Sequence, residues 1–396
     1  MTAVEACDDG SGSAPEAHAA AYEAALAAHR RGDAALARAA AVDLCAACET
    51  HARGWALRAA LEPTEADDAA AARRALDFAE RAWRLRPDSR ICVHSLVRAL
   101  VRLDAAAKPR TSLDVLRRAA DLAPDDATMQ FGYGSAARSL KLPDVAAEAY
   151  RRTLAIDPLH ERAAFWLATL GGAIDAVKSA PLDHVRALYD GYAPRYDSHL
   201  AEALKSRTPD LCAAALFAAA GGPIGACIDL GCGTGLSGAA LRSCGEFTRL
   251  DGVDLSSAMA ALSRSRGCYD DVACADLCAA LLEPNRFAIY AAAVVSDVLV
   301  YFGDLDPFFA ACAHAAKPAA WLVFSLEDAA EGATWELATT GRFKHGVAHV
   351  IATANARGFA VETATREALR MQAGLPVAGT IYVCRAPATP SVDARP

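Results

Sequence analysis

The spacing of apolar residues divides the chain into two regions. From about residue 16 to 175, apolar residues recur three and four positions apart among Ala, Leu, Arg and Glu, the spacing of amphipathic helices. From about residue 182, short apolar runs alternate with helical stretches. This alternation predicts a mostly parallel sheet with helices on both faces. We therefore expect an α region followed by an α/β region.

Seven apolar runs in the second region are the predicted strands. They read ACIDL, RLDGVDL, DVACADL, YAAAVVSDV, AWLVFSLE, FAVETAT and TIYVCRA. The last two, at 359–365 and 380–386, have little between them. They could therefore pair antiparallel at an edge of the sheet.

Three helical segments of the first region end alike, with a proline five positions after a small residue. The prolines are Pro87, Pro124 and Pro158, spaced 37 and 34 residues apart. A helix–turn–helix period of 34 residues is typical of tetratricopeptide repeats, and the proline ends the second helix. Gly134 and Tyr150 fall where two such helices cross closely or an aromatic ring fills the gap. A generic Ala-rich helical bundle is the alternative.

Composition and charge narrow the classes of partner. The chain has 396 residues, a formal charge of -8 and a pI near 5.7, and its Lys and Arg form no dense stripe, so we expect no nucleic-acid partner. The apolar stretch 211–222 is too short and too interrupted by glycine for a membrane span. The start lacks the segments of a signal peptide, which favours a cytoplasmic protein with reduced thiols. Cys45 and Cys48, with His51 nearby, have ligand-like spacing, but no second pair exists, and we expect no metal site.

The stretch CIDLGCGTGL, at 227–236, reads as a buried strand, a turn and the start of a helix. Glycines at 231, 233 and 235 let the backbone approach a ligand without an intervening side chain. Dinucleotide enzymes use G-x-G-x-x-G, whereas this chain has G-x-G-x-G with Asp229 before it. A carboxylate there would repel a pyrophosphate but could bind an ammonium group. S-adenosylmethionine carries an ammonium and a sulfonium and no phosphate.

Two further acids follow predicted strands. Asp254 ends the second strand, 19 residues after Gly235, where an acid can accept hydrogen bonds from both ribose hydroxyls of NAD or S-adenosylmethionine. Its alternative role is the N-cap of the next helix, although Ser256 could do that better. Asp276 ends the third strand, where it could reach an adenine amino group or simply cap a helix.

The fourth strand carries the remaining candidate chemistry. Its carboxyl end is Ser296–Asp297–Val298, the position where ligands bind in open α/β sheets. Tyr301 follows in the exit loop. An aromatic ring there could stabilise a sulfonium by a cation–π interaction, or it could be an ordinary core residue.

These motifs together resemble the class I S-adenosylmethionine-dependent methyltransferases, and more narrowly the bacterial ones with an N-terminal tetratricopeptide array. The resemblance covers 185–386 by motif and 16–175 by architecture. The stretches that carry it are CIDLGCGTGL, GVDLSSAM, SDVLVYFGDL, LYDGYAPRYDSHLAEALKSRTPD, GRFKHGVAHVIATANARGF and LRMQAGLPVAGTIYV.

The resemblance implies a multidomain α and α/β chain. We expect a disordered tail at 1–15 and tetratricopeptide-like repeats at 16–180. A Rossmann-like, seven-stranded methyltransferase domain would follow at 181–386, with a second disordered tail at 387–396.

The resemblance also implies residue roles. The cofactor would contact Asp229, Gly231, Cys232, Gly233, Gly235, Asp254, Leu255, Asp276 and Leu277, with Tyr192 and Tyr196 closing over it from a lid-like helix. Asp297, Tyr301, Arg342 and His345 would face the acceptor pocket. His345 would be the candidate general base, or merely a polar residue at a helix N-terminus, and Arg342 could orient a substrate carboxylate.

One departure from the family concerns backbone geometry. The turn before the fifth strand is Pro-Gly-Gly in such proteins and Pro318-Ala319-Ala320 here. Because alanine disfavours positive φ, we expect this turn to differ in type.

The sequence thus favours a methyltransferase that acts on an O, N or C acceptor of a small-molecule or carrier-bound substrate, with the repeats recruiting a protein partner. Two alternatives remain: a protein methyltransferase whose target docks on the repeat groove, and a non-catalytic adaptor that binds S-adenosylmethionine. An NAD-dependent oxidoreductase is disfavoured by G-x-G-x-G and Asp229.

Overall fold

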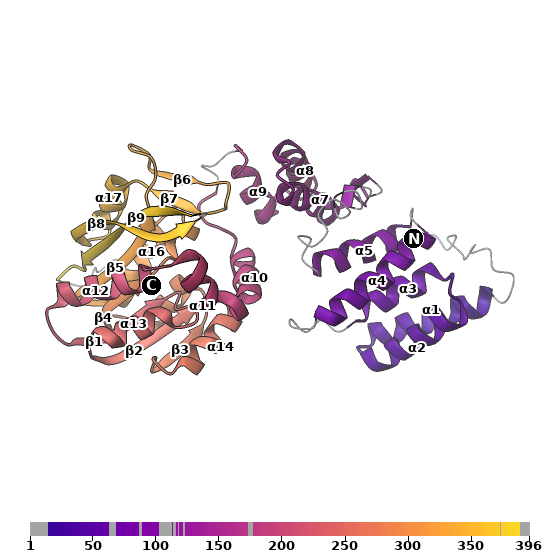
Figure 1. Cartoon of the computed structure of the whole chain (residues 1–396), viewed down its shortest axis with the longest axis horizontal. Coiled ribbons are helices and arrows are strands. Elements are labelled where there is room, and N and C mark those ends of the chain that lie inside the picture. The colour runs from indigo at the N-terminus through magenta and orange to yellow at the C-terminus, as the bar shows by residue number, and fades with distance from the viewer. Residues whose placement is uncertain are drawn as a thin grey trace. The chain divides into compact units, whose positions relative to one another are not determined.

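The computed structural model describes residues 15–62, 69–86, 89–102, 113, 116–117, 119–121, 123–172, 177–372 and 374–388. The chain forms two compact units, Met1–Leu170 and Gly171–Pro396, and each is described by itself (Figure 1). Within the described ranges, no helix combines the length and apolarity needed to cross a bilayer. Most of both predicted tails, residues 1–14 and 389–396, lies outside the described residues, as does Pro87.

The first unit consists of helices that pack mainly against their neighbours in sequence. Helix α7 packs on α8 and α8 on α9, as α1 does on α2 and α3 on α4. A Cβ placed at Gly134 would lie 2.8 Å from the ring of Tyr150, so glycine lets α7 and α8 cross closely. This unit is therefore helical as predicted, and its assignment as tetratricopeptide repeats stays a prediction. The helices are α1 Pro15–Arg30, α2 Ala34–Ala47, α3 Ala52–Ala60, α4 Ala69–Leu85, α5 Arg90–Arg102, α7 Ala127–Ser139, α8 Pro143–Ile156 and α9 Glu161–Ala168.

The second unit is built on a seven-stranded sheet of order β3-β2-β1-β4-β5-β9-β8. Strands β1 to β5 run parallel, while β9 is antiparallel to both β5 and β8. All seven predicted strands are present, and the last two do pair antiparallel at an edge. The strands are β1 Ile224–Leu230, β2 Phe247–Asp254, β3 Asp271–Cys274, β4 Tyr290–Val295, β5 Ala316–Glu327, β8 Ala360–Gln372 and β9 Leu375–Arg385.

A small ribbon that the sequence did not predict pairs β6, Trp335–Leu337, with β7, Phe343–His345. Residues 177–180, which the sequence analysis placed in the helical region, lie in the second unit. There the Ala180 N–H donates to the Tyr301 carbonyl over 2.8 Å.

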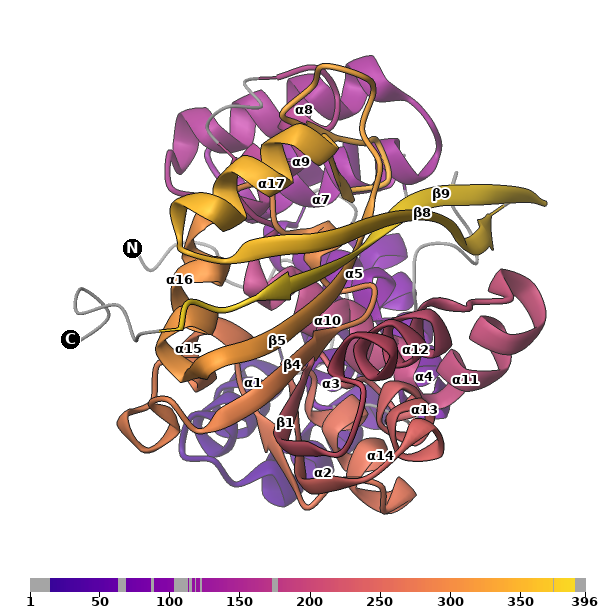
Figure 2. The same cartoon turned by 90° about the vertical axis from the view of Figure 1, so that its left-hand side faces the viewer.

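Helices cover both faces of the sheet. Figure 2 shows α16 and α17 on one side and α12 and α13 on the other. Because side chains alternate along a strand, Ile228 and Leu230 pack on the first face while Cys227 packs on the second. The helices are α10 Leu182–Tyr192, α11 Tyr196–Ser198, α12 Thr208–Ala220, α13 Leu236–Cys244, α14 Ser257–Arg266, α15 Leu277–Leu281, α16 Asp306–Ala315 and α17 Val347–Ala356, with a π-helical turn η4 at His199–Leu204.

The stretch Pro318-Ala319-Ala320, which lies in the first part of β5 where its pairing with β4 is irregular, contradicts one expectation. Ala319 has a φ of +57°, and its N–H donates to the Pro387 carbonyl over 3.1 Å. The expectation that alanine would avoid the left-handed region is wrong. The tertiary hydrogen bond holds a conformation that costs an alanine roughly 1–2 kcal/mol.

Candidate functional site

The glycine turn joins β1 to α13 and needs glycine at every predicted position. Gly231, Gly233 and Gly235 have φ values of +77°, +55° and +92°. A Cβ at Gly231 would lie 2.3 Å from the Val298 side chain, so the turn presses against the loop after β4. The carboxyl ends of β1, β2 and β4 thereby meet at one edge of the sheet, where open α/β sheets bind ligands.

A cavity of about 260 Å³ opens at this edge. It is lined by residues from the loops after β1 to β4 and from the segment 179–196. The sequence-predicted residues that line it are Gly231, Gly233, Asp254, Leu255, Asp276, Leu277, Tyr196, Asp297 and Tyr301. Tertiary structure thus gathers residues that lie more than a hundred positions apart in the sequence.

Asp254 presents a carboxylate to the cavity. Its two oxygens accept from the N–H groups of Gly233 and Ser256, each over 2.8 Å. Burial raises the pKa of Asp254, and the two N–H donors oppose that rise. The helix-capping role belongs to Ser256, whose hydroxyl accepts from the Met259 N–H over 3.1 Å. Asp254 therefore remains available to a ligand.

Asp229 is fully buried at the end of β1 and is not among the cavity-lining residues. Its Oδ2 accepts from the Tyr269 hydroxyl over 2.5 Å, while Oδ1 has no hydrogen-bond partner among the described residues. Burial raises the pKa of Asp229 to about 7. A buried carboxyl oxygen without a partner is costly, and a polar group that reached Oδ1 would remove that cost.

Asp276 is a helix cap, one of the two roles that the sequence left open, and it also lies at the cavity. It lines the cavity, and its Oδ1 accepts from the Ala279 N–H over 2.9 Å as the N-cap of α15. Cys232 departs from the prediction. Its side chain packs away from the cavity against Ala260 and Val272, and only its backbone belongs to the turn.

The segment 182–204 covers the cavity from one side. Tyr196 lines the cavity, whereas Tyr192 lies outside it, with its ring edge-on to Tyr196 and its hydroxyl bonded to His199. Asp190 anchors α10 because it accepts from the Ser256 hydroxyl over 2.6 Å and from the Ala258 N–H over 3.2 Å. Of the two tyrosines that were expected to close over the cofactor, Tyr196 therefore lines the cavity and Tyr192 does not.

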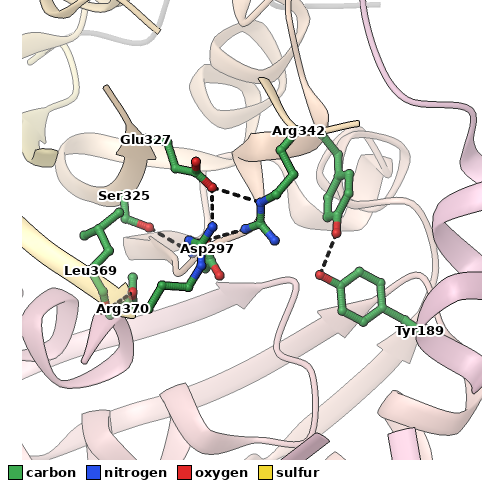
Figure 3. Close-up of polar contacts among 9 residues, drawn as sticks. Tyr189, Asp297, Ser325, Glu327, Arg342, Leu369 and Arg370 are labelled. Atoms are coloured by element: carbon green, nitrogen blue, oxygen red, sulfur yellow. Dashed lines mark hydrogen bonds and ion pairs between the residues drawn. The ribbon is translucent and has the colours of Figure 1, made fainter. Parts of the chain in front are cut away.

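The loop after β4 is held by four buried or half-buried charges, which we call the charged quartet: Asp297, Glu327, Arg342 and Arg370 (Figure 3). Asp297 Oδ1 accepts from Arg342 over 2.8 Å and from Arg370 over 3.1 Å. Glu327 Oε1 accepts from the same arginines over 2.9 and 2.5 Å. Arg342 does not line the cavity, so its predicted place in the acceptor pocket is not supported.

Asp297 itself lines the cavity in a strained conformation, with a φ of +59°. Its N–H donates to the Ser325 hydroxyl over 2.8 Å. Beside it, the hydroxyls of Tyr301 and Tyr189 lie 2.9 Å apart, and both rings line the cavity (Figure 3). The wall near Asp297 is thus aromatic, with one carboxylate.

His345 lies elsewhere than predicted. It is 1% exposed, belongs to β7 and does not line the cavity. Its Nε2 bonds to the Gly303 carbonyl over 3.0 Å, so it holds the loop after Tyr301. Burial lowers the pKa of His345 to about 4. Neither its position nor its basicity suits a general base.

Sequence reasoning missed Tyr189, Asp190, Tyr269, Glu327 and Arg370. Tyr189 and Asp190 fall inside the quoted lid stretch, and Glu327 ends a predicted strand, so their placement could have been suspected. Arg370 lies inside the quoted stretch LRMQAGLPVAGTIYV, where no role was expected for it, and Tyr269 lies in no motif, so only the fold brings both to the site. Among the residues that the structure describes, no three His, Cys, Asp or Glu side chains gather as metal ligands would.

Comparison with known proteins gives a family match. Residues 227–319 match the family model described as "Methyltransferase domain". No curated protein sequence matches the chain significantly.

Several solved structures are similar to the chain. One is the 1,6-didemethyltoxoflavin-N1-methyltransferase of Burkholderia thailandensis, solved with 1,6-didemethyltoxoflavin and S-adenosylhomocysteine bound. It is 16% identical, with a TM-score of 0.41 over 53% of this chain and 91% of that chain. The [4+2]-cyclase SpnF is 18% identical, with a TM-score of 0.42 over 52% and 96%. An S-adenosylmethionine-dependent methyltransferase of Mesorhizobium loti is 21% identical, with a TM-score of 0.31 over 40% and 90%. We draw no conclusion about activity from these likenesses, because the identities and TM-scores are low.

The family match begins inside β1 and ends inside β5, so it contains the glycine turn, Asp254, Asp276 and Asp297. It therefore spans the loops that line most of the cavity. Residues 227–319, which include β2 to β4 and parts of β1 and β5, are therefore similar to a methyltransferase domain.

Proposed function

We propose that the chain transfers a methyl group from S-adenosylmethionine to an O, N or C acceptor on a small-molecule or carrier-bound substrate. The observation that carries this proposal is Asp229, whose buried Oδ1 lacks a partner among the described residues. A cationic amino group would satisfy it. Asp229 and Asp254 accept hydrogen bonds from neutral donors, namely a tyrosine hydroxyl and two backbone N–H groups. Two carboxylates whose charge is not compensated favour a positively charged nucleoside and disfavour a pyrophosphate.

The residues present fit this cofactor. Asp254 would accept from the ribose hydroxyls, Asp276 and Leu277 would flank the adenine, and the glycine turn would admit the methionine end. Tyr196 would cover it from the lid. The cofactor supplies a methyl group already activated by the sulfonium.

The protein itself then has to align the acceptor with the methyl group and to exclude water from the cavity. Tyr189, Tyr196 and Tyr301 provide aromatic walls that favour a cation and keep solvent out. Holding an acceptor in line with the methyl group contributes on the order of 7–11 kcal/mol in favourable cases. Asp297 is the carboxylate of this wall, but two arginines already pair with it, so an acceptor that is already deprotonated and needs no base suits the site better.

Calorimetry on the full chain tests the proposal. S-adenosylmethionine should bind with a micromolar Kd and NAD should not bind. Binding of NAD alone, or of neither compound, would overturn it.

For the first unit we propose tetratricopeptide-like repeats that recruit a protein partner, supported by consecutive helix pairs and by the close crossing at Gly134. Incubating the full chain with labelled S-adenosylmethionine and host lysate separates the candidates. Labelled small molecules or carriers support the leading proposal, and a labelled protein supports a protein methyltransferase that docks its target on the repeats. Cofactor binding without any labelled product supports a non-catalytic adaptor.

A further inference from the structure

Tyr269 links two elements beneath the glycine turn. It lies between α14 and β3, and its hydroxyl donates to Asp229 Oδ2 over 2.5 Å. The same hydroxyl accepts from the Gly238 N–H, in the first turn of α13, over 2.9 Å. One neutral group therefore fixes the carboxylate at the end of β1 relative to the helix that follows the turn.

Two glycines make room for this ring. A Cβ at Gly238 would lie 2.3 Å from Tyr269 Cζ, and one at Gly252 would lie 3.0 Å from Cys232 Sγ and 3.3 Å from Tyr269 Cδ1. Neither glycine has a positive φ, so backbone conformation does not require them. The close approach of the tyrosine ring requires glycine at position 238, and the ring and Cys232 together limit the space at Gly252.

We propose that Tyr269 is a positioning residue for the amino-acid end of the cofactor: it occupies Oδ2 of Asp229 and leaves Oδ1, which has no partner among the described residues, to the α-ammonium group. This inference rests on the proposed function. A hydroxyl orients the carboxylate without neutralising it, whereas an arginine or lysine in its place would cancel the charge that the ammonium needs.

Electrostatics supports the same role. Burial raises the pKa of Asp229, and the hydrogen bond from Tyr269 opposes that rise. The other titratable groups facing Asp229 are the Asp254 carboxylate, whose charge raises the pKa further, and the thiols of Cys212, Cys227, Cys232 and Cys268, whose own pKa values are raised by burial. The hydroxyl of Tyr269 thus increases the fraction of Asp229 that is ionised near neutral pH.

The test compares two ligands on the full chain by calorimetry. S-adenosylmethionine carries the ammonium, while 5′-methylthioadenosine shares the nucleoside and lacks the amino-acid end. Tyr269→Phe keeps the ring and removes the hydroxyl. Tyr290→Phe is the matched control, because Tyr290 also donates to a buried carboxylate, Asp251, over 2.9 Å. Asp251 pairs with Ile228, the neighbour of Asp229 in β1, and so lies on the other face of the sheet.

We expect Tyr269→Phe to weaken S-adenosylmethionine about tenfold, the effect of one hydrogen bond to a charged group, and to change 5′-methylthioadenosine less than about twofold. Tyr290→Phe should change neither affinity. Combining Tyr269→Phe with Asp229→Asn should cost little more than Asp229→Asn alone, since both act through one carboxylate. Equal weakening of both ligands, or of neither, would overturn the positioning role.

A second variant keeps the hydroxyl in case its removal unfolds the chain. 3-Fluorotyrosine at position 269 is a stronger donor, so it should lower the pH at which the affinity for S-adenosylmethionine reaches half its maximum. The affinity for 5′-methylthioadenosine should not depend on pH in that range. An unchanged midpoint contradicts the inference while leaving the proposed function intact, whereas a wild-type chain that binds neither ligand overturns both.

Discussion

Two groups of buried carboxylates stand at the same edge of the sheet with opposite electrostatic surroundings. Asp229 and Asp254 are held by neutral donors, namely a tyrosine hydroxyl and backbone N–H groups. Asp297 and Glu327 are held by Arg342 and Arg370, so the charged quartet sums to zero. The first group retains its negative charge for an incoming cation, while the second is already compensated within the protein.

Carboxylates at one cavity can therefore have different roles, depending on whether their hydrogen-bond donors are neutral or positively charged. An uncompensated carboxylate in a low-dielectric site raises its own pKa and attracts a cation. A carboxylate that is paired with arginines instead holds the neighbouring segments in place, because breaking an ion pair would leave a buried charge without a partner. Ligand binding and loop positioning are thereby separated within a single cavity.

The largest effect is expected from breaking the charged quartet. Arg370→Met should lower the free energy of unfolding by about 3–5 kcal/mol, because it leaves the buried Glu327 and Asp297 with one cation between them. Denaturant titration measures this. Arg366→Met is the matched control on the same strand, since Arg366 pairs with Asp328 but its side chain is 75% exposed. The control should cost less than about 1 kcal/mol. Equal losses in the two variants would mean that the quartet is not a stabilising joint.

The next largest effect is expected on the affinity for ligands at the carboxylates whose charge is not compensated. Asp254→Ala should weaken S-adenosylmethionine and 5′-methylthioadenosine alike, by about 100-fold, because both share the ribose and two charge-assisted hydrogen bonds are lost. Calorimetry measures both affinities. Asp306→Ala removes an exposed carboxylate of the same unit and should leave them unchanged. If Asp254→Ala binds both ligands normally, the ribose assignment is wrong.

The pH dependence of stability sharpens the comparison further. The pKa of Asp229 is raised to about 7 in the folded chain from an ordinary value of 3.8. Its contribution to the unfolding free energy is therefore fully present below about pH 4 and is lost as the pH rises through 7.

In the absence of cofactor, Asp229→Asn should remove this component. We expect a difference of roughly 2 kcal/mol between pH 4 and pH 8, discounted from the full shift for relaxation around the charge. Denaturation at the two pH values measures it. Identical pH profiles for the variant and the wild-type chain would show that folding does not raise the pKa of Asp229.

The smallest effect separates backbone strain from charge compensation. Asp297 and Ala319 both have positive φ, but Ala319 carries no ion pair. Ala319→Gly should therefore stabilise the chain by about 1 kcal/mol. This value gives the cost of a positive φ in this chain, and the charged quartet holds Asp297 in a conformation of the same kind. Thermal unfolding measures this. Ala214→Gly, on the exposed face of α12, should instead destabilise by about 1 kcal/mol, and a destabilised Ala319→Gly would contradict the strain argument.

Much of the fold could be predicted from local pattern. The alternation of apolar runs with helical stretches placed all seven strands of the main sheet, and the chain spacing anticipated the antiparallel edge pair. The two-stranded ribbon of β6 and β7 was missed because its strands span three residues each, too few for a period to emerge. Ala319 was misjudged because residue preference is local, whereas its conformation is fixed by a bond to Pro387.

The candidate site divides in the same way. Gly231 in the glycine turn and Asp254 at a strand end do line the cavity. Their positions could be predicted because strand ends and turns can be located from the local sequence. His345 and Arg342 were expected there on resemblance alone. The fold instead buries His345 against the loop after Tyr301 and commits Arg342 to two carboxylates.

The sequence by itself determined where strands end and which of those ends carry glycine or a carboxylate, because period and turn chemistry act over a few neighbouring residues. Only the tertiary structure decided which carboxylates keep their charge. That depends on partners such as Tyr269 and Arg370, which lie 40 and 73 residues from the acids they contact. Compensation of buried charge is a property of contacts in space, and no local pattern records it.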